Sequence, residues 1–503
     1  MTASARPAGD AAVLERWEPV IGIEVHCQLK TASKMFCGCS TASDEAPPNS
    51  LTCPVCLGLP GALPVANRQA VEFVLATGIA IGATTPTTTR WERKNYFYPD
   101  LPKGYQISQY EIPLTADGHL VIDTSDGPFR VGITRAHLEE DTARLVHATT
   151  PDGRTVSLVD FNRSGVPLME IVTEPDIRTA EQARRYAEEL QLLLRAIGVS
   201  DADMEKGQLR VEANVSLRPR TAGSVFGTRV EVKNMNSFRS VERAIDFEIA
   251  RQAATLEAGG SIRQETRGWD EDRGLTYHQR TKEDSEDYRY FPEPDLPPLR
   301  VEQAWLERIE GLLPELPATR RRRYVAELGL SAYDAAVIVN DATMSTAFEA
   351  ISAADRSLPA KEVANLVTGD YSRLAKDTAV RSAEGLVGSA NAADLADILR
   401  RVASTELSRP NAKEVLAEHI ATGGSIGSIV ARRGLRQISD VGALVTVIDE
   451  VLTVNEAAVA DYRAGKDQAI GFLVGQVMKA TRGQANAEIA AAAIRGRLDE
   501  TAG

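Results

Sequence analysis

Four of the five cysteines in this 503-residue chain fall within one short stretch. Cys37, Cys39, Cys53 and Cys56 follow the pattern C-x-C-x13-C-x-x-C, and Pro54 and Gly58 shape the turn around the second pair. Paired thiols at this spacing in a reducing compartment are typical of a tetrahedral thiolate zinc site. The pattern therefore predicts a zinc knuckle over residues 37–56, with redox thiols or a chance cluster as the alternatives.

Carboxylates also recur inside apolar, strand-like stretches of the first 300 residues rather than in polar turns. Acids held close together in a folded protein repel one another unless cations neutralise them. Mg²⁺ is the natural candidate, because carboxylate oxygens hold it while positions stay open for substrate phosphates. Structural acids paired with nearby Arg and Lys are the alternative. The acids concerned are Glu24 beside His26, Glu139, Glu140, Asp141, Asp160, Glu170, Glu174, Glu212 and Glu231.

Basic and amide side chains accompany these acids along the sequence. A metal-rich cleft lined with such donors suits phosphoryl transfer, which depends on positioning and charge neutralisation. The usual nucleotide-binding loops and the serine nucleophile elbow are missing from the sequence. The residues thus indicate a metal-dependent, phosphate-handling enzyme. The donors are Arg163, Arg210, Lys233, Asn162, Asn214, Asn234 and Asn236, with Arg135 as a further basic partner for the acids.

These residues need an antiparallel sheet to position them. Residues 20–29 alternate in polarity, which predicts a strand with Glu24, His26 and Gln28 on one face, lining a site. Further strands are predicted at residues 129–134, 154–161, 209–216 and 228–232. Helices are predicted at residues 67–82, 179–197 and 240–258. The fold class is therefore α+β.

Length and composition divide the chain into domains. A composition of 43% hydrophobic and 25% charged residues is that of folded protein. We expect a disordered extension at residues 1–18, a sheet domain at 19–297, a helical domain at 298–408 and a helical tail at 409–503. No apolar run is long enough to span a membrane, and no signal peptide precedes residue 19, so we expect a cytoplasmic protein without a membrane partner.

A net charge of −13 argues against non-specific binding of nucleic acid. The excess acid lies before residue 409, because residues 409–503 contain 11 basic and 11 acidic residues. A basic patch on this tail could still contact RNA, with solvated helix charges as the alternative. The candidate contacts are Arg432, Arg433, Arg436, Lys479 and Arg482.

Stretches spread from residue 20 to residue 486 include IGIEVHCQL, HLEEDTARL, LVDFNRSGVPLMEIVTEPD, EVKNMNSFRS, DYRYFPEPDL and GFLVGQVMKATRGQAN. In these stretches the chain resembles the family of B subunits of the aspartyl/glutamyl-tRNA amidotransferases. This resemblance implies a cradle domain related to the glutamine synthetase catalytic fold, then an all-helical domain and a small tail that engages tRNA.

The resemblance also implies a reaction, that of a ligase. ATP phosphorylates the side-chain carboxylate of Glu-tRNA(Gln) or Asp-tRNA(Asn), and ammonia from the partner A subunit, a glutaminase, displaces the phosphate. A small C subunit completes the heterotrimer, and DNA has no part. The four cysteines match the zinc-bearing members of the family, which implies a structural Zn²⁺. A zinc-containing, tRNA-binding scaffold is the alternative, but a scaffold has no need of strand-borne acids.

The family's metal ligands correspond to Glu24, His26, Glu139, Glu140 and Glu231, which implies Mg²⁺ at these positions. Many relatives have Arg-Cys-Asp where this chain has Arg210-Val211-Glu212, which leaves the role of Glu212 open. Catalytic roles are expected for Glu24, His26, Glu140, Glu231, Arg163 and Lys233. Contacts with ATP are expected from Asp160, Asn162, Arg210, Asn214 and Asn234.

Overall fold

The computed structural model of the chain describes residues 15–43, 46–221, 223, 225–281, 288–377, 392–438, 441–481 and 483–500. The chain forms two compact units, residues 1–316 and residues 317–503. Of the predicted N-terminal extension, residues 1–14 lie outside the described part, and the first strand already begins at Trp17.

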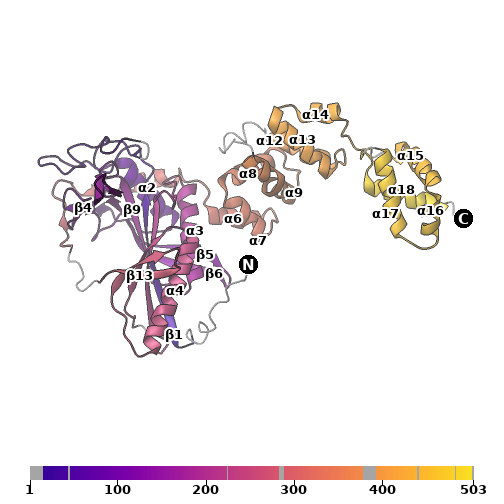
Figure 1. Cartoon of the computed structure of the whole chain (residues 1–503). Helices are drawn as coiled ribbons and strands as arrows, with labels where there is room; N and C mark the ends of the chain where they lie inside the picture. Colours follow the sequence, from indigo (N-terminus) through magenta and orange to yellow (C-terminus); the bar gives the residue numbers. More distant parts are fainter. Residues whose placement is uncertain are drawn as a thin grey trace. The chain divides into compact units, whose positions relative to one another are not determined.

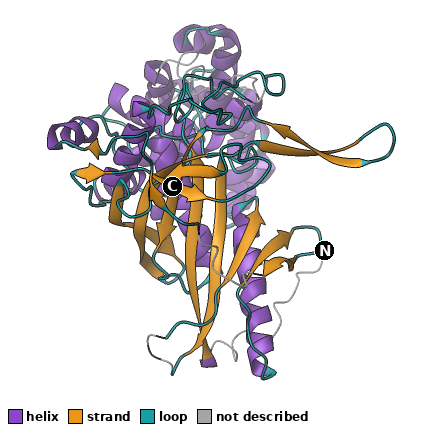
Figure 2. Cartoon of the chain, turned by 90° about the vertical axis from the view of Figure 1, so that its left-hand side faces the viewer, coloured by secondary structure: helices purple, strands orange, loops and turns teal. Residues whose placement is uncertain are grey.

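An eight-stranded sheet forms the frame of the first unit (Figures 1 and 2). Neighbouring strands are antiparallel except β11 and β12, which run parallel. In sheet order the strands are β13 (Leu275–Thr281), β12 (Glu265–Asp270), β11 (Val230–Met235), β10 (Leu209–Pro219), β1 (Trp17–Gln28), β9 (Pro167–Thr173), β6 (Gly127–Glu140) and β5 (Thr115–Thr124).

Three helices pack against this sheet, at the places that the sequence predicted. They are α2 (Arg68–Ala80), α3 (Ala180–Ala196) and α4 (Phe238–Glu257). Thr179 and Ser237 begin α3 and α4, since each side chain accepts a hydrogen bond from a backbone N–H of the first turn. The buried sides of the helices share one core with Ile21, Ile23 and Val25 of β1, so the sheet's other face is left for polar residues.

The described residues of the first unit also form smaller sheets. They are β2 (Thr88–Thr89) with β15 (Leu299–Arg300), β14 (Phe291–Pro292) with β3 (Glu92–Asn95) and β4 (Tyr105–Ser108), and β7 (Arg144–Thr149) with β8 (Thr155–Asp160). Helix α5 (Gln303–Glu310) follows, and its Trp305, Leu306 and Ile309 pack on the same core. The first unit therefore continues past the predicted boundary at residue 297 to Leu316.

The described part of the second unit is helical, as predicted. Helices α15 to α18 have a core of their own, which includes Leu444, Ile448, Leu473 and Ile494. No helix among the described residues is long and apolar enough to cross a membrane. The helices are α6 (Pro317–Ala326), α7 (Ala332–Val339), α8 (Ala342–Ala354), α9 (Ala360–Leu366), the π-helix η1 (Val367–Tyr371), α10 (Ser372–Asp377), α12 (Ala392–Ala403), α13 (Arg409–Thr422), α14 (Ile426–Arg433), α15 (Val441–Val454), α16 (Glu456–Arg463), α17 (Gln468–Ala480) and α18 (Ala487–Glu500).

Candidate functional site

Strand β1 lies in the middle of the sheet and carries the first acid and histidine of the site. Its residues alternate between the core and the opposite face, as the sequence predicted, and Glu24 and His26 lie on that opposite face. The strand register sets Glu212 of β10 opposite Glu24 and Glu170 of β9 opposite His26. His137 of β6 lies opposite Glu170, so four strands contribute to one row of ionisable residues.

His26 joins two groups of potential metal ligands. One group is Glu24, His26 and Glu212, and the other is His26, Glu139 and Glu170; within each group the ligand atoms lie within 4.8 Å of one another. The His26 Nε2 atom is 3.5 Å from a Glu170 oxygen, 3.7 Å from a Glu24 oxygen and 3.9 Å from a Glu139 oxygen. Such a cluster of carboxylates is suited to binding a hard divalent cation.

The electrostatics of this cluster show which acid most lacks a positive partner. Burial, with repulsion from Glu170, raises the pKa of Glu24 to about 7. Burial alone would lower the pKa of His26, but the Glu170 hydrogen bond and neighbouring carboxylates raise it to about 9. Burial alone would raise the pKa of Glu139, but Lys94 lowers it well below its ordinary value. Glu24 is therefore the acid that gains most from an added cation.

Basic side chains surround the cluster and partly neutralise it. The Lys94 Nζ atom lies 3.7 Å from a Glu139 oxygen, and the Arg135 guanidinium lies 4.0 Å from Glu170. Lys233 Nζ lies 2.7 Å from Glu212. The site thus combines a potential cation site with three basic groups that could hold an anionic substrate.

Asp141 fits the alternative of a structural acid. It is buried, and it accepts hydrogen bonds from Gln28 at 3.0 Å and from Arg210 at 3.2 Å. Arg163 lies 3.7 Å away, and its guanidinium also donates to two backbone carbonyls. Burial alone would raise the pKa of Asp141, but Arg210 and Arg163 lower it. Arg163 and Arg210 are thus engaged with a satisfied carboxylate.

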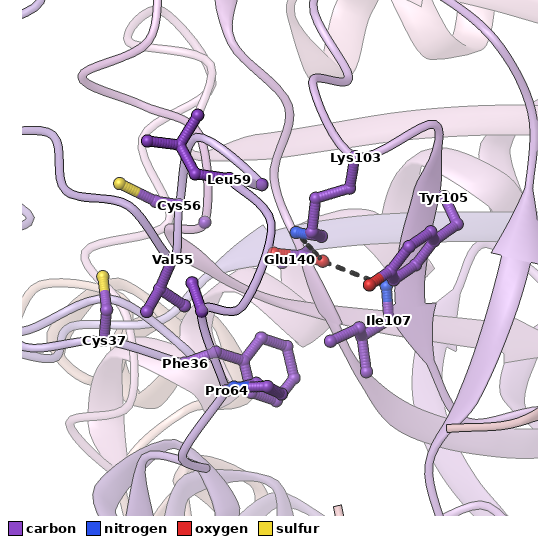
Figure 3. Close-up of a pocket in the computed structure, with 13 residues that line it drawn as sticks. Phe36, Cys37, Val55, Cys56, Leu59, Pro64, Lys103, Tyr105, Ile107 and Glu140 are labelled. Atoms are coloured by element: carbon purple, nitrogen blue, oxygen red, sulfur yellow. Dashed lines mark hydrogen bonds and ion pairs between the residues drawn. The ribbon is translucent and has the colours of Figure 1, made fainter. Parts of the chain in front are cut away.

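Glu231 and Glu140 are not members of the two groups that His26 joins. Glu231 accepts a hydrogen bond from Thr266 at 2.8 Å and lies 3.2 Å from Lys233. Glu140 lies 2.6 Å from Lys103 and accepts from the backbone N–H of Ile107 at 3.0 Å. Figure 3 shows Glu140 on the wall of a pocket that Cys37 and Cys56 also line. Glu140 therefore faces the cysteine side of the site.

Two residues that the sequence assigned to ATP hold the cysteine-bearing loop. Asn162 is fully buried, accepts from the N–H of Leu51 at 2.8 Å and donates to the carbonyl of Pro47 at 2.8 Å. Asp160 accepts from the backbone N–H groups of Asn49 and Asn162. Both side chains are thus used within the protein.

The other two amides that the sequence assigned to ATP lie towards β11. Asn214 on β10 lies opposite Gly22 on one side and Glu231 on the other. Asn234 on β11 has a positive φ of 64° and donates to the Tyr277 hydroxyl at 3.4 Å.

Most of the basic residues predicted to contact tRNA form ion pairs with acidic residues of the second unit. Arg432 and Arg433 form ion pairs with Glu418, and Arg436 lies 3.3 Å from Glu406. Lys479 is exposed near the end of α17. Arg482 lies outside the described residues.

Three residues of the site were missing from the set predicted by sequence. Glu170 was counted among the strand acids but given no role, and His137 and Lys94 were not considered. Glu170 lies inside an apolar, strand-like stretch, residues 167–173, as Glu24 does in its own strand. This signal could have identified Glu170 from the sequence. Lys94 lies on the short strand β3, whose position beside Glu139 follows from long-range packing.

The four cysteines come together as the spacing predicted. Their sulfur atoms lie within 4.8 Å of one another, and the N–H of Cys53 donates to the sulfur of Cys56 at 3.1 Å. The donation of the Cys37 thiol to Cys56, with the charge of nearby Lys34, lowers the pKa of Cys56 to about 4. Four thiols with a stabilised thiolate fit the donor set of a structural Zn²⁺.

Replacing Cys53 by Ser should remove the zinc and destabilise the first unit, because three thiolates hold Zn²⁺ far less tightly. Metal analysis of the purified chain should give about one zinc per chain for the natural sequence and far less for the variant. Cys27→Ala is the matched control, since Cys27 is a core residue of β1 that does not belong to this group of four thiols, and Ala buries no polar atom there. A metal-free natural chain with ordinary stability would contradict the zinc assignment.

Comparison with known proteins shows the family of the chain. A family model described as the GatB/GatE catalytic domain matches residues 19–307, and a second, described as the GatB domain, matches residues 346–498. Three similar curated proteins are each named as the B subunit of aspartyl/glutamyl-tRNA(Asn/Gln) amidotransferase. The protein from Moorella thermoacetica is 52% identical over 96% of this chain and 100% of its own length. Those from Anaeromyxobacter sp. and Roseiflexus sp. are 50% and 49% identical, over 96% and 95% of this chain and 99% and 97% of their own lengths. The chain therefore belongs to the family of aspartyl/glutamyl-tRNA(Asn/Gln) amidotransferase B subunits.

Proposed function

We propose that this chain is the activating subunit of a tRNA-dependent amidotransferase, a ligase. It uses ATP to phosphorylate the side-chain carboxylate of Glu-tRNA(Gln), Asp-tRNA(Asn) or both. Ammonia released from glutamine by the partner A subunit then displaces the phosphate and gives Gln-tRNA(Gln) or Asn-tRNA(Asn). A small C subunit completes the cytoplasmic complex.

The observation that carries this proposal is the pair of acid groups that share His26. Their carboxylates come from β1, β6, β9 and β10, so the sheet holds them close together against their mutual repulsion. Glu24, Glu139, Glu170 and Glu212 would hold Mg²⁺, and His26 would have to lose its ring proton to join them as a ligand. When bound, Mg²⁺ neutralises the phosphates of ATP and orients the phosphoryl group for transfer.

The basic side chains around the acid cluster would help the anionic substrates to bind. The substrate carboxylate and the phosphate groups are all anionic, and they must approach a site that already contains these carboxylates. Lys94, Arg135 and Lys233 lie on the edges of the acid cluster, where their charges offset this repulsion. Burial alone would lower the pKa of Lys94, but Glu139 and its neighbours raise it well above its usual value, so the ammonium stays charged.

The alternative of a scaffold without catalysis is disfavoured by the same cluster. Burying carboxylates together costs stability, and a protein that only binds tRNA gains nothing from that cost. The test is amidation of Glu-tRNA(Gln) and Asp-tRNA(Asn) by the assembled complex, with ATP and Mg²⁺ supplied or omitted. Amide formation that requires both supports the proposal, and amide formation without ATP contradicts it.

We expect the basic residues of the tail to contact tRNA. Lys479 is exposed on α17, and none of the ion pairs among the described residues includes it, so Lys479→Glu should weaken tRNA binding. The slope of log affinity against log salt should become shallower by about one, as for one lost phosphate contact. Lys466→Glu is the control, because Lys466 is equally a surface lysine but pairs with Asp461 at 2.8 Å. Equal effects of the two variants would contradict a specific role for Lys479.

A further inference from the structure

Two tyrosine rings stack on each other in the first unit. The rings of Tyr110 and Tyr290 have centroids 4.4 Å apart and planes inclined by 13°. Tyr110 follows strand β4 and Tyr290 directly precedes strand β14, so two distant parts of the chain build this tyrosine pair. Tyr110 is 50% exposed, so the pair can be reached from solvent. An accessible aromatic ring is suited to stacking on a flat ring of a ligand.

The tyrosine pair adjoins the acids of the candidate site. The rings of Tyr290 and Tyr288 meet edge to face at 6.1 Å, and the Lys94 ammonium lies 5.2 Å from the centre of the Tyr288 ring. Lys94 in turn lies 3.7 Å from Glu139. Burial raises the pKa of Tyr290 and Lys94 lowers it, while Glu139 and Glu170 raise it further. A ligand bound on the tyrosine pair would therefore lie next to the acid cluster.

Arg135 adds a positive group to the same place. Its guanidinium carbon lies 5.6 Å from the centre of the Tyr110 ring, and its Nη2 atom lies 4.0 Å from Glu170. Its Nε atom is buried and has no hydrogen-bond partner among the described residues. A buried N–H group without a partner costs free energy, which a ligand oxygen would recover. Arg135 and the tyrosine pair thus offer an anion-binding group beside an aromatic ring.

Buried side chains hold this part of the chain in place. The carboxylate of Glu92 is buried and accepts a hydrogen bond from the backbone N–H of Tyr110 at 2.5 Å. Gln109 is fully buried and accepts from the N–H of Leu138 on β6 at 3.1 Å. The backbone at Tyr110 is therefore fixed against the strand that carries Arg135. Such preorganisation reduces the entropy that is lost when a ligand binds.

An aromatic ring beside a guanidinium is suited to a nucleotide. Every base has a flat face that stacks on aromatic side chains, and an arginine pairs well with a phosphate. A charged tRNA ends in adenosine, whose ribose carries the amino acid, so this base must lie near the acids during phosphorylation. ATP also contains adenine, but its phosphates would have Mg²⁺ as their partner. The terminal nucleotide of tRNA has a single phosphodiester, which one arginine can neutralise.

We propose that Arg135 and the tyrosine pair form the subsite for the terminal adenosine of the charged tRNA. The base would stack on Tyr110, and the Arg135 guanidinium would pair with the phosphate of that nucleotide. The amino acid on the ribose would then extend towards Glu139 and Glu170. This inference rests on the proposed function, which makes charged tRNA the substrate.

The test compares tRNA with and without its last nucleotide. The affinity of the full chain for tRNA(Gln) or tRNA(Asn) is measured with the intact RNA and with RNA that lacks the terminal adenosine and its phosphate. The truncated RNA should bind the natural chain about tenfold to a hundredfold more weakly. In Tyr110→Leu this difference should shrink to about threefold or less, whereas Tyr110→Phe keeps the ring and should keep the difference. Arg135→Gln should also reduce the difference, and it decides the inference if Tyr110→Leu does not fold.

Tyr98→Leu is the matched control. Tyr98 is 53% exposed, and its ring contacts that of Tyr96 and does not belong to the tyrosine pair. This variant should distinguish the two RNAs as the natural chain does, and Tyr110→Leu should bind ATP with Mg²⁺ as the natural chain does.

Three results would each overturn the inference. They are equal binding of the two RNAs by the natural chain, an unchanged difference in Tyr110→Leu, and a loss of ATP affinity in Tyr110→Leu with unchanged tRNA binding. An equal loss of the difference in Tyr98→Leu would also contradict a specific role for Tyr110. The comparison requires no catalysis, so a natural chain that fails to amidate with ATP and Mg²⁺ would refute the proposed function and leave the binding result standing.

Discussion

Replacement of Glu24 by Gln is expected to lower the rate of ATP-dependent phosphorylation of aminoacyl-tRNA by about a hundredfold to a thousandfold. Gln keeps the volume of the side chain and removes the charge. Glu24 belongs to one of the two metal-ligand groups, and burial with repulsion from Glu170 raises its pKa to about 7. This carboxylate is therefore the one most in need of a cation, and its loss should weaken Mg²⁺ binding without unfolding the sheet.

The control for this variant is Glu18→Gln. Glu18 lies on the same strand and the same face, but it pairs with Arg218 at 2.6 Å, away from the two groups. Phosphorylation rates are measured at several Mg²⁺ concentrations for both variants. A Glu24→Gln chain that phosphorylates at the normal rate would show that Glu24 holds no metal needed for the reaction.

Replacement of Glu140 by Gln is expected to destabilise the first unit by about 3 to 5 kcal/mol. Glu140 and Lys103 form an ion pair of 2.6 Å whose side chains are 3% and 11% exposed. Removing the carboxylate leaves a buried ammonium without its charge partner, and that costs more than the pair itself contributes. Chemical denaturation of the natural chain and the variant measures this loss.

The double variant Glu140→Gln/Lys103→Met separates the structural effect from a catalytic one. Removing both charges should restore much of the stability, because no unpaired charge remains buried. If Glu140 is instead a magnesium ligand, as the family resemblance implies, Glu140→Gln should abolish phosphorylation while its unfolding free energy stays unchanged. That result would contradict the structural role.

Much of the site could be predicted from sequence, because successive side chains of a strand point to opposite faces of the sheet. The pattern of residues 20–29 predicted the faces of Glu24 and His26, and the cysteine spacing predicted the cluster of four thiols. Both signals are local, so they need no knowledge of which strands pair. The same alternation separates Glu139 from Glu140, since consecutive residues on a strand point to opposite faces. Glu139 accordingly lies near His26, and Glu140 lies near the cysteines.

What the sequence could not provide is the order of the strands. Glu170 contacts His26 because β9 pairs with β1, although these two strands lie far apart in the chain. Hydrophobic pattern predicts that both strands exist, but not that they are neighbours. The same limit explains Asn162, whose amide hydrogen bonds depend on residues 47–51, which lie far from it in the sequence.

The central claim is that this chain, and not its partner, activates the carboxylate. The direct test supplies the isolated full-length chain with ATP labelled at the γ-phosphate, Mg²⁺ and Glu-tRNA(Gln) or Asp-tRNA(Asn), without any partner subunit. Hydroxylamine, which intercepts acyl phosphates, converts the activated side chain to a hydroxamate. We predict hydroxamate on the tRNA-bound amino acid together with released phosphate, both dependent on charged tRNA and both lost in Glu24→Gln. Phosphate release and hydroxamate formation that appear only after a partner subunit is added, and that then survive Glu24→Gln, would contradict the account.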